Sequence, residues 1–103
     1  MQVRVFPIAR ERLLDIWQYT SEEWGDAQAD DYVRGLMTAA LALPTKRHLW
    51  RPVKERRLSG VYFFHHRHHY LFFKVLEEGA LGILSILHEN MNLPDRLRDD
   101  MEL

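Results

Sequence analysis

Residues 21–32 read SEEWGDAQADDY, and this stretch decides how the first half of the chain folds. Gly25 follows a segment whose residues at spacings of three and four form one face of an amphipathic helix: Ala9, Leu13, Trp17, Thr20 and Trp24. Glycine is common just past a helix C-terminus, because it adopts a left-handed conformation without steric cost. Asp26 predicts the N-terminal cap of a second helix. So short a link between two helices permits only an antiparallel helical hairpin.

The second helix is predicted to run from Asp26 until Pro44 stops it. Its apolar stripe again follows spacings of three and four: Ala29, Tyr32, Val33, Leu36, Ala40 and Leu43. Ahead of the hairpin, Gln2 to Phe6 alternates polar and apolar residues, as a short strand does. Two such helices side by side leave an apolar face that needs a sheet.

The second half of the chain supplies that sheet. Three segments rich in β-branched and aromatic residues are separated by short links and predict an antiparallel meander: Val61–Phe64, Tyr70–Val75 and Leu81–Leu87. Leu93-Pro94-Asp95 then predicts the start of a short last helix over Arg96 to Met101. We therefore expect one α+β domain over residues 1–103, a two-layer β-α-α-β-β-β unit with the helical hairpin packed on a small, mainly antiparallel sheet.

The composition limits the classes of protein to consider. A chain of 103 residues that is 47% hydrophobic forms one real core but not two. Its apolar runs are far shorter than the roughly 20 residues that span a bilayer, so we expect no membrane segment and a cytoplasmic location. Cysteine is absent, which excludes a disulfide framework and thiolate metal ligands. Nothing in the sequence predicts a cofactor.

Charge is unevenly spread along the chain, although the net charge is only -1. Residues 10–34 hold seven acidic residues against three arginines, whereas residues 46–57 hold six basic residues against Glu55 alone. Solvated surfaces explain both runs, and a basic patch that meets an acidic partner or phosphates explains the second. A net charge near zero argues against a protein that binds nucleic acid directly.

Residues 63–73 read FFHHRHHYLFF and place four histidines within five positions. A metal site needs side chains that converge on one point, and in a strand only residues two apart share a face. RNA cleavage is an alternative, because histidine and arginine beside aromatic rings supply proton transfer and phosphate binding. A polar turn between two strands requires neither, and we favour it for His65, His66 and His68, with His69 starting the second strand.

Two blocks of sequence resemble a known family. The first is Trp24-Gly25 followed by Gln28-Ala29 and Tyr32, and the second is Ile83-Leu84, Ile86-Leu87-His88 and Met91-Asn92. At this separation they resemble the ParE family, within the ParE/RelE superfamily of type II toxin-antitoxin systems. The resemblance extends from Ile8 to about Leu97.

This resemblance implies a toxin that acts on DNA gyrase, blocks replication and provokes double-strand breaks. It also implies a hetero-oligomer with a ParD-like antitoxin, a ribbon-helix-helix protein whose C-terminal segment wraps the toxin. A poison of this kind works by binding, so no residue is assigned a catalytic role. Whether the target is gyrase or topoisomerase IV stays open.

The RelE branch of the superfamily offers a second hypothesis, because its members are ribosome-dependent mRNA endonucleases with arginines on the sheet. Here Tyr62 and Ser85 stand where those arginines are usual. Their loss removes positive charge needed at a cleaved phosphate and argues against RNase activity. ParE-like chains often keep these arginines too, so a non-toxic remnant that only binds its antitoxin is a third hypothesis.

The resemblance also suggests which residues meet the partners. The C-terminal segment that ParE-like toxins keep is the candidate for target binding: His88, Met91, Asn92, Leu93 and Arg96. Trp17 on a helix stripe and Trp50, Arg56 and Arg57 in the basic segment are the candidates for antitoxin binding. Trp24 and Tyr32 are expected to fix the helical hairpin rather than to touch a partner.

Overall fold

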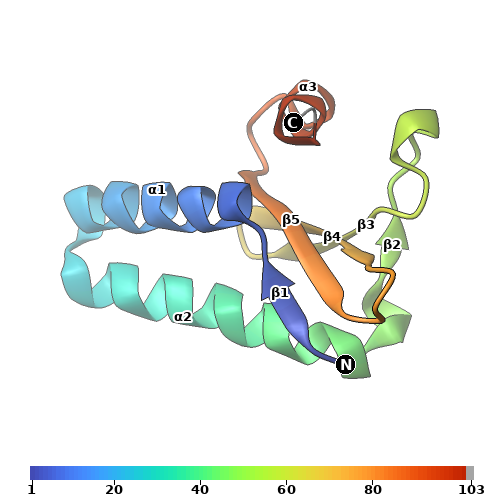
Figure 1. Cartoon of the computed structure of the whole chain (residues 1–103). Helices are drawn as coiled ribbons and strands as arrows, with labels where there is room; N and C mark the ends of the chain where they lie inside the picture. The colour runs from blue at the N-terminus through green and yellow to red at the C-terminus, as the bar shows by residue number, and fades with distance from the viewer. Residues whose placement is uncertain (102–103) are drawn as a thin grey trace.

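The computed structural model describes residues 1–101, and its elements confirm the predicted order. The helices are α1 (Pro7–Trp24), α2 (Asp26–Ala42) and α3 (Leu93–Met101), with short 3-10 turns at Leu43–Thr45, Arg47–Leu49 and Arg56–Leu58. The strands are β1 (Val3–Val5), β2 (Arg51–Pro52), β3 (Tyr62–His66), β4 (His69–Val75) and β5 (Leu81–His88). The predicted α+β class with a helical hairpin, a meander and a short last helix is confirmed (Figure 1).

The strands form one mixed sheet in the order β1-β5-β4-β3-β2. β1 pairs parallel with β5, and Val3 lies opposite Leu81. The other neighbours are antiparallel, and the β4–β5 register shifts at Phe72/Phe73, where a β-bulge lets Ser85 face away from the hairpin. The parallel edge strand is the reason that the chain must cross over the sheet through the hairpin before it builds the meander.

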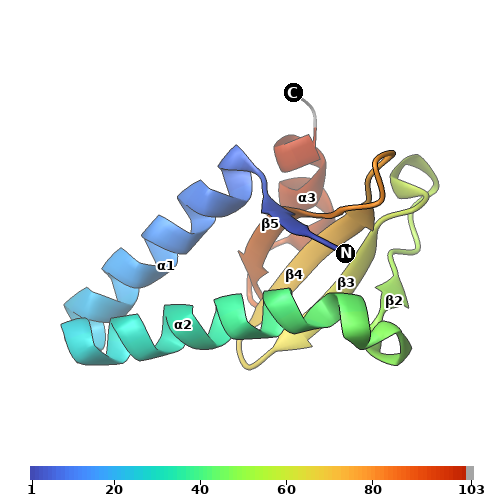
Figure 2. The ribbon, with the colours of Figure 1, turned by 60° about the horizontal axis from the view of Figure 1, so that its bottom comes forward.

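The helical hairpin covers one face of the sheet (Figures 1 and 2). Gly25 ends α1 at φ +94°, and its amide donates to the carbonyl oxygen of Ser21. Leu36 of α2 packs with Phe73 and Ile83 of the sheet, and all three side chains are fully buried. The hairpin is therefore held by apolar contacts of the kind that its periodicity predicts.

The opposite face of the sheet is covered by α3 and by the segment that leads into β3. Leu97 of α3 packs with Phe72 and Leu84 of the sheet, and Leu58 joins the same cluster from the loop side. This second core is smaller than the first, and it leaves Phe63 and Tyr70 only partly buried. α3 thus rests on the sheet as a separate layer (Figure 1).

Three details differ from the sequence predictions. β2 was not expected, because a two-residue strand that ends in Pro52 within a basic segment reads as a loop. The turn in the histidine segment is only Arg67–His68: His65 and His66 belong to β3, and His66 pairs with His69. Arg67 takes the left-handed conformation with φ +53° that closes this tight turn.

Three side chains of the helical hairpin also differ from the sequence predictions. Ile16 is the residue of α1 that enters the core beside Ala9, whereas Trp24 is 68% exposed. Trp24 therefore buries little of its side chain in the hairpin, which does not fit the expectation that it fixes the hairpin. Asp26 is not a cap for its own helix either, since Gly25 occupies that position and the Asp26 carboxylate accepts a hydrogen bond from Ser21.

Within residues 1–101, no helix has both the length and the apolar character needed to cross a membrane.

Candidate functional site

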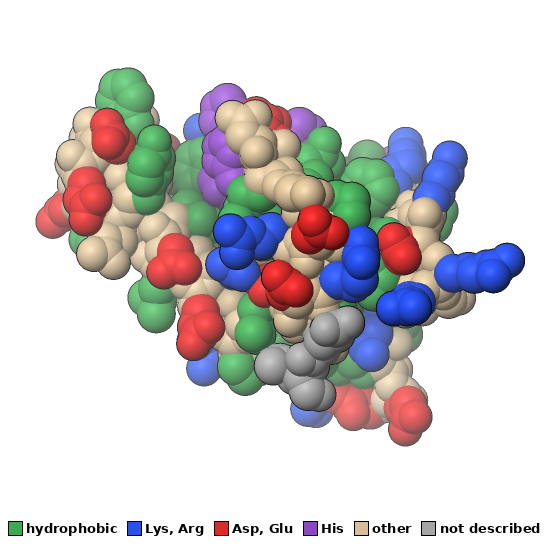
Figure 3. Space-filling view, turned by 90° about the horizontal axis from the view of Figure 1, so that it is seen from above, with side chains coloured by type: hydrophobic (Ala, Val, Ile, Leu, Met, Phe, Trp, Pro, Cys, Tyr) green, Lys and Arg blue, Asp and Glu red, His purple; other side chains and the backbone are tan. Residues whose placement is uncertain are grey.

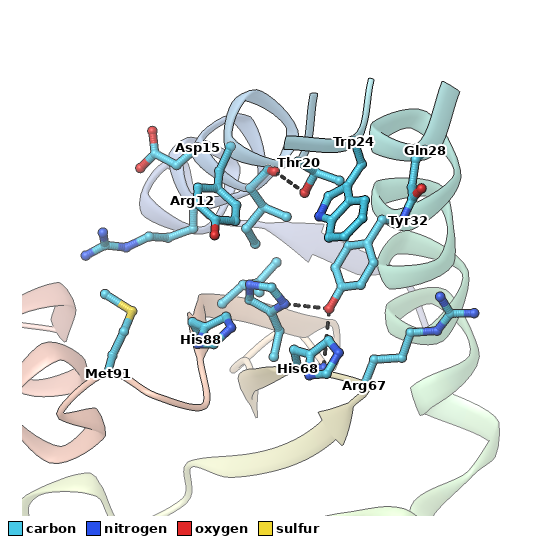
Figure 4. A pocket seen from close by; sticks show the side chains of 14 residues that line it. Arg12, Asp15, Thr20, Trp24, Gln28, Tyr32, Arg67, His68, His88 and Met91 are labelled. Carbon is cyan, nitrogen blue, oxygen red and sulfur yellow. Dashed lines mark hydrogen bonds between the residues drawn. The ribbon is translucent and has the colours of Figure 1, made fainter. Parts of the chain in front are cut away.

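A cavity of about 640 Å³ opens between the tip half of the helical hairpin and the adjoining ends of β4 and β5 (Figure 4). We call it the hairpin pocket. Its apolar lining comes from α1, α2, β5 and the link to α3: Ile16, Tyr19, Trp24, Tyr32, Ile86 and Met91. Its size lies in the range of ligand-binding cavities, which are mostly apolar with a few convergent polar groups.

Tyr32 and His69 form the polar centre of the hairpin pocket. The Tyr32 hydroxyl lies 2.6 Å from His69 Nδ1, and the His68 amide donates to the same hydroxyl oxygen at 3.3 Å. Burial lowers the pKa of His69 to about 4, with nearby His88 and His68 adding to the effect, so its ring is neutral at physiological pH. Burial also raises the pKa of Tyr32. Because the hydroxyl oxygen already accepts from an amide, the hydroxyl proton is free to point at Nδ1.

His88 lies against His69 with an edge-to-face ring contact at 5.0 Å between centroids. Its Nδ1 accepts a hydrogen bond from the Asn90 amide at 3.0 Å, so this nitrogen carries no proton in the arrangement and Nε2 is the donor. The floor of the hairpin pocket therefore has the neutral ring of His69 beside a His88 ring whose Nδ1 already accepts a hydrogen bond. Such rings suit hydrogen bonding to a bound group better than neutralisation of a phosphate.

Glu89 connects the link before α3 to the β3–β4 turn. Its carboxylate lies 2.9 Å from His65 Nε2 and 3.0 Å from His68 Nδ1, and its amide donates to the His68 carbonyl oxygen at 2.9 Å. The hydrogen bonds from His68 and His65 lower the pKa of Glu89. Both histidines are exposed, so these contacts orient the turn rather than stabilise the fold strongly.

A polar network on the far side of β5 holds α3 in place. Arg12 of α1 donates to the Asp100 carboxylate at 2.6 Å and 3.2 Å, and the Ser85 hydroxyl donates to the same carboxylate. The hydrogen bond to Asp100 raises the pKa of Arg12, and burial opposes it. Asp100 and Ser85 are buried, so this network joins α1, β5 and α3 in a low-dielectric setting.

A second cavity, of about 310 Å³, lies on the α3 side of the sheet between α3 and the segment before β3. We call it the α3 groove. Phe63, Tyr70 and Phe72 line it from the strands, and Leu93 and Leu97 line it from α3. Lys54 and Glu55 line it too, and exposed Arg56 and Arg57 follow them in the same segment. Figure 3 shows Lys and Arg side chains gathered at this end of the molecule.

No metal cluster is present in the part of the chain that the structure describes: no three side chains of histidine, aspartate or glutamate among residues 1–101 lie where they share an ion. His65 and His68 point instead at one carboxylate, that of Glu89.

Comparison with known proteins fits this architecture. Residues 3–93 match the family described as ParE toxin of type II toxin-antitoxin system, parDE. The chain belongs to the ParE toxin family. Toxin ParE1 of Mycobacterium tuberculosis strain H37Rv shares 31% identity over 91 residues, which cover 88% of this chain and 92% of that protein.

Solved structures agree with this ParE assignment at the level of the fold. The chromosomal ParDE toxin-antitoxin system from P. aeruginosa has a chain that superposes with a TM-score of 0.73 at 17% identity, covering 85% of this chain and 95% of that one. The toxin-antitoxin complex RelBE2 from Mycobacterium tuberculosis gives a TM-score of 0.65 at 16% identity, with 85% and 96% covered. Both neighbours come from toxin-antitoxin systems, as the resemblance in the sequence implies.

The predicted target-binding residues of this ParE chain divide between the two cavities. His88 and Met91 line the hairpin pocket, whereas Leu93 lines the α3 groove. Asn92 lies at the start of α3, where its side-chain amide donates to the Asp95 carboxylate at 2.8 Å. Its backbone carbonyl oxygen accepts a hydrogen bond from the Arg96 backbone amide at 3.0 Å. The five residues are close in sequence but do not form one surface, and their role in target binding stays a prediction.

The predicted antitoxin-binding residues are spread further. Trp17 donates from Nε1 to Asp30 at 2.8 Å and so ties the two helices of the hairpin together. Trp50 donates to the Leu43 carbonyl oxygen at 2.9 Å and packs edge-on against Phe73, with ring centroids 5.1 Å apart. Trp50 is thus partly buried against the core on the hairpin side, next to the β2–β3 pairing that the sequence did not predict.

Arg56 and Arg57 are exposed, as expected, on the 3-10 turn that leads into β3. Trp17 lies on the helical hairpin and Trp50 packs against the core, so the four antitoxin candidates come from separate elements, and their role stays a prediction.

The two positions where the family often has arginine are both packed. The Tyr62 ring contacts Trp50 and Phe73 on the hairpin side, with centroid distances of 5.2 Å and 6.0 Å. Ser85 is fully buried on the α3 side and bonds to Asp100. Neither position presents a cation, and the guanidinium nearest to Ser85 in the network comes from Arg12.

Sequence reasoning missed several groups that shape the site. Tyr19 and Arg67 line the hairpin pocket, although neither was singled out. Tyr19 lies off the apolar stripe predicted for this helix, and a residue at such a position is expected to be solvated. The Arg12–Asp100 pair joins residues 88 positions apart, and no local pattern signals such a contact.

Proposed function

We propose that this ParE-family toxin inhibits DNA gyrase by binding it, which blocks replication and leads to double-strand breaks. Family membership over residues 3–93 is the observation that carries the proposal. The hairpin pocket supports it, since His88 and Met91 of the predicted target-binding segment line an apolar cavity of binding-site size. Action on gyrase takes place in the cytoplasm.

Three features favour binding over cleavage of RNA. Tyr62 and Ser85 provide no positive charge on the sheet, and a phosphate under attack needs such charge. His69 has a pKa of about 4, so it is not an imidazolium acid at neutral pH. The likeness to RelBE2 concerns the fold, and sheet residues rather than the fold decide this chemistry. We therefore propose that the toxin is not an enzyme.

We further propose that a ParD-like antitoxin neutralises the toxin in a hetero-oligomer. The α3 groove has a mainly apolar lining that includes Lys54 and Glu55, and exposed Arg56 and Arg57 follow in the same segment. A segment that is disordered alone and folds as an amphipathic helix with acidic residues matches these properties. Its apolar side chains would supply most of the affinity, and the charges would mainly speed association.

Expression of the toxin without its antitoxin in a bacterial host tests the target. We expect growth to stop with filamentation and a DNA-damage response while protein synthesis continues at first, and we expect the antitoxin to restore growth. The double variant His88→Ala, Met91→Ala should lose at least tenfold in potency, with Leu14→Ala, which lies outside the pocket, as the matched control. Early arrest of translation with cleaved mRNA would refute the gyrase proposal and favour the endonuclease.

A further inference from the structure

The tip of the hairpin leaves two aromatic side chains in solvent at the hairpin pocket. Trp24 is 68% exposed and Tyr19 is 65% exposed, and both line the cavity. Figure 4 shows Trp24 lying beside Tyr32 at the opening. The indole nitrogens of Trp17 and Trp50 each donate a hydrogen bond, whereas that of Trp24 makes none with the rest of residues 1–101. Large aromatic groups exposed beside an apolar cavity are typical of binding hot spots.

The interior of the hairpin pocket between α1 and β5 is mainly apolar, while the two arginines of its lining lie at its edges: Arg12 is paired with Asp100 of α3, and Arg67 comes from the β3–β4 turn. Ile16 and Ile86 come from α1 and β5, and Met91 closes the side toward α3. Between them lie His69 and His88, whose Nδ1 atoms are both engaged in hydrogen bonds. A cavity of about 640 Å³ with such a floor accommodates more than one large apolar side chain. A charged group buried between these apolar side chains would lose its hydration, which is costly unless the group is paired.

The α1 side of the opening is acidic. Asp15 lines the cavity, and exposed Glu22 and Glu23 precede Trp24 on the same helix. None of these three carboxylates has an ion-pair partner within the described part of the chain. Figure 3 shows acidic side chains spread over the hairpin end of the molecule, opposite the basic end. A lysine or arginine at this rim would meet the carboxylates of Glu22 and Glu23 and the faces of Trp24 and Tyr19, which attract cations.

We propose that the hairpin pocket binds a basic, apolar segment of the protein that the toxin inhibits. A large apolar side chain of that segment enters between Trp24 and Ile86, and a neighbouring arginine or lysine lies over Trp24 and Tyr19 beside Glu22 and Glu23. The antitoxin occupies a different surface, because the basic border of the α3 groove suits an acidic segment. This inference rests on the proposed function for the identity of the partner, but the chemistry of the pocket is testable without it.

The three tryptophans provide the readout, since each indole N–H gives its own signal in a ¹⁵N spectrum. The probes are two synthetic twelve-residue peptides, one with a central Leu-Phe pair between arginines and one with glutamates in place of the arginines. We expect the arginine peptide to shift the Trp24 signal, to leave Trp17 and Trp50 almost unchanged, and to bind at least tenfold more tightly than the glutamate peptide. Equal binding of both peptides, or no shift of Trp24, would overturn the proposal.

Substitutions separate the two parts of the contact. Trp24→Ala should weaken binding of the arginine peptide at least tenfold, measured by calorimetry, and Leu14→Ala is the matched control because Leu14 is similarly exposed on α1 at 65% but lies outside the cavity. Glu22→Lys with Glu23→Lys should weaken binding mainly at low salt. Since all these side chains are exposed, the fold should persist, and thermal unfolding verifies it. Equal losses for Trp24→Ala and Leu14→Ala would contradict a specific pocket.

The partner is tested with the purified proteins. Gyrase subunits should shift or broaden the Trp24 signal and displace the arginine peptide, whereas the antitoxin should leave Trp24 accessible to it. An antitoxin that blocks the peptide at Trp24 would overturn the assignment to the target and make the antitoxin the occupant. A toxin that binds the peptide at Trp24 but leaves gyrase unaffected would refute the proposed function while supporting the pocket chemistry.

Discussion

The two faces of the sheet are held by different forces. On the hairpin face, the long helices α1 and α2 pack on fully buried apolar side chains such as Leu36, Phe73 and Ile83. On the other face, the nine-residue α3 rests on a smaller cluster through Leu97 and is tied down by Asp100. The hairpin is thus an inseparable part of the fold, whereas a few specific contacts decide whether α3 is attached.

This difference follows from length and composition. A helix of nine residues is not stable alone in water, because forming its first turn costs more entropy than so few hydrogen bonds recover. α3 therefore depends on its contacts with β5 and α1. Because Arg12 lines the hairpin pocket while its partner Asp100 belongs to α3, the network also connects the hairpin pocket to α3.

The largest effect is expected from removing the same side chain on each face. Leu36→Ala should lower the free energy of unfolding by about 3–5 kcal/mol, and Leu97→Ala by about 2–3 kcal/mol, although both leucines are buried. The space that Leu36→Ala leaves in the core stays in the fold until the whole domain unfolds. In the Leu97→Ala variant, α3 can instead detach locally. Urea unfolding gives the two values, and hydrogen exchange shows which helix opens. A larger loss of unfolding free energy for Leu97→Ala than for Leu36→Ala, with hydrogen exchange that is uniform over the helices, would contradict this difference between the two faces.

The second effect concerns pH on the hairpin side. The folded-state pKa of His69, about 4, lies below its ordinary value of 6.5, so the unfolded chain binds a proton more readily between these values. The stabilising contribution is complete above about pH 6.5 and is lost as pH falls toward 4, with a total of up to about 3 kcal/mol. Urea unfolding at several pH values should show this slope. His69→Asn keeps an acceptor for the Tyr32 hydroxyl and should flatten the dependence of the unfolding free energy on pH. An unchanged slope in this variant would exclude His69 as the cause of the dependence.

The third effect concerns the polar network that holds α3. Asp100→Ala leaves Arg12 and the buried Ser85 hydroxyl without their shared acceptor, and we expect a loss of about 2–3 kcal/mol. Asp99→Ala, at the exposed neighbouring position, is the matched control and should change stability by less than about 0.5 kcal/mol. Faster hydrogen exchange confined to α3 in the Asp100 variant would support local attachment. Equal stability of the Asp100 and Asp99 variants would exclude the idea that Asp100 holds α3 in place.

The smallest effect is expected in the histidine segment. Replacing His65, His66 and His68 together by Asn should lower stability by less than about 1 kcal/mol, because His65 and His68 contact Glu89 only at the exposed edge of the molecule. Toxicity should stay near normal. Thermal unfolding and metal analysis of the untagged protein check this expectation. A large loss of stability together with a stoichiometric metal would show that the segment has a role other than a β-hairpin.

The sequence predicts the parts of this molecule that local rules govern. Gly25 marks the centre of the helical hairpin, Pro94 marks the start of α3, and the apolar runs give three of the strands, because helix ends and strand propensity depend on neighbouring residues. β2 escapes these rules, since two residues with a proline acquire strand character only by pairing with β3.

The site is less predictable because it depends on contacts between distant segments. Periodicity places Trp24 on the stripe of α1, yet the hairpin extends past the sheet at that point and leaves the indole in solvent. Asp100 reads as part of a charged tail until the fold brings Arg12 to it. His88 was identified through the family resemblance, whereas its ring contact with His69 required the β4–β5 register.

A supercoiling assay with purified components shows whether the toxin inhibits DNA gyrase. Toxin free of antitoxin is added to DNA gyrase, relaxed plasmid and ATP, and the products are separated by gel electrophoresis. We expect loss of supercoiling with accumulation of linear DNA, and restoration when the antitoxin is added in equimolar amount. Gyrase inhibition would be refuted if supercoiling continued undisturbed with toxin in excess over gyrase while the same preparation cut mRNA in a translating extract.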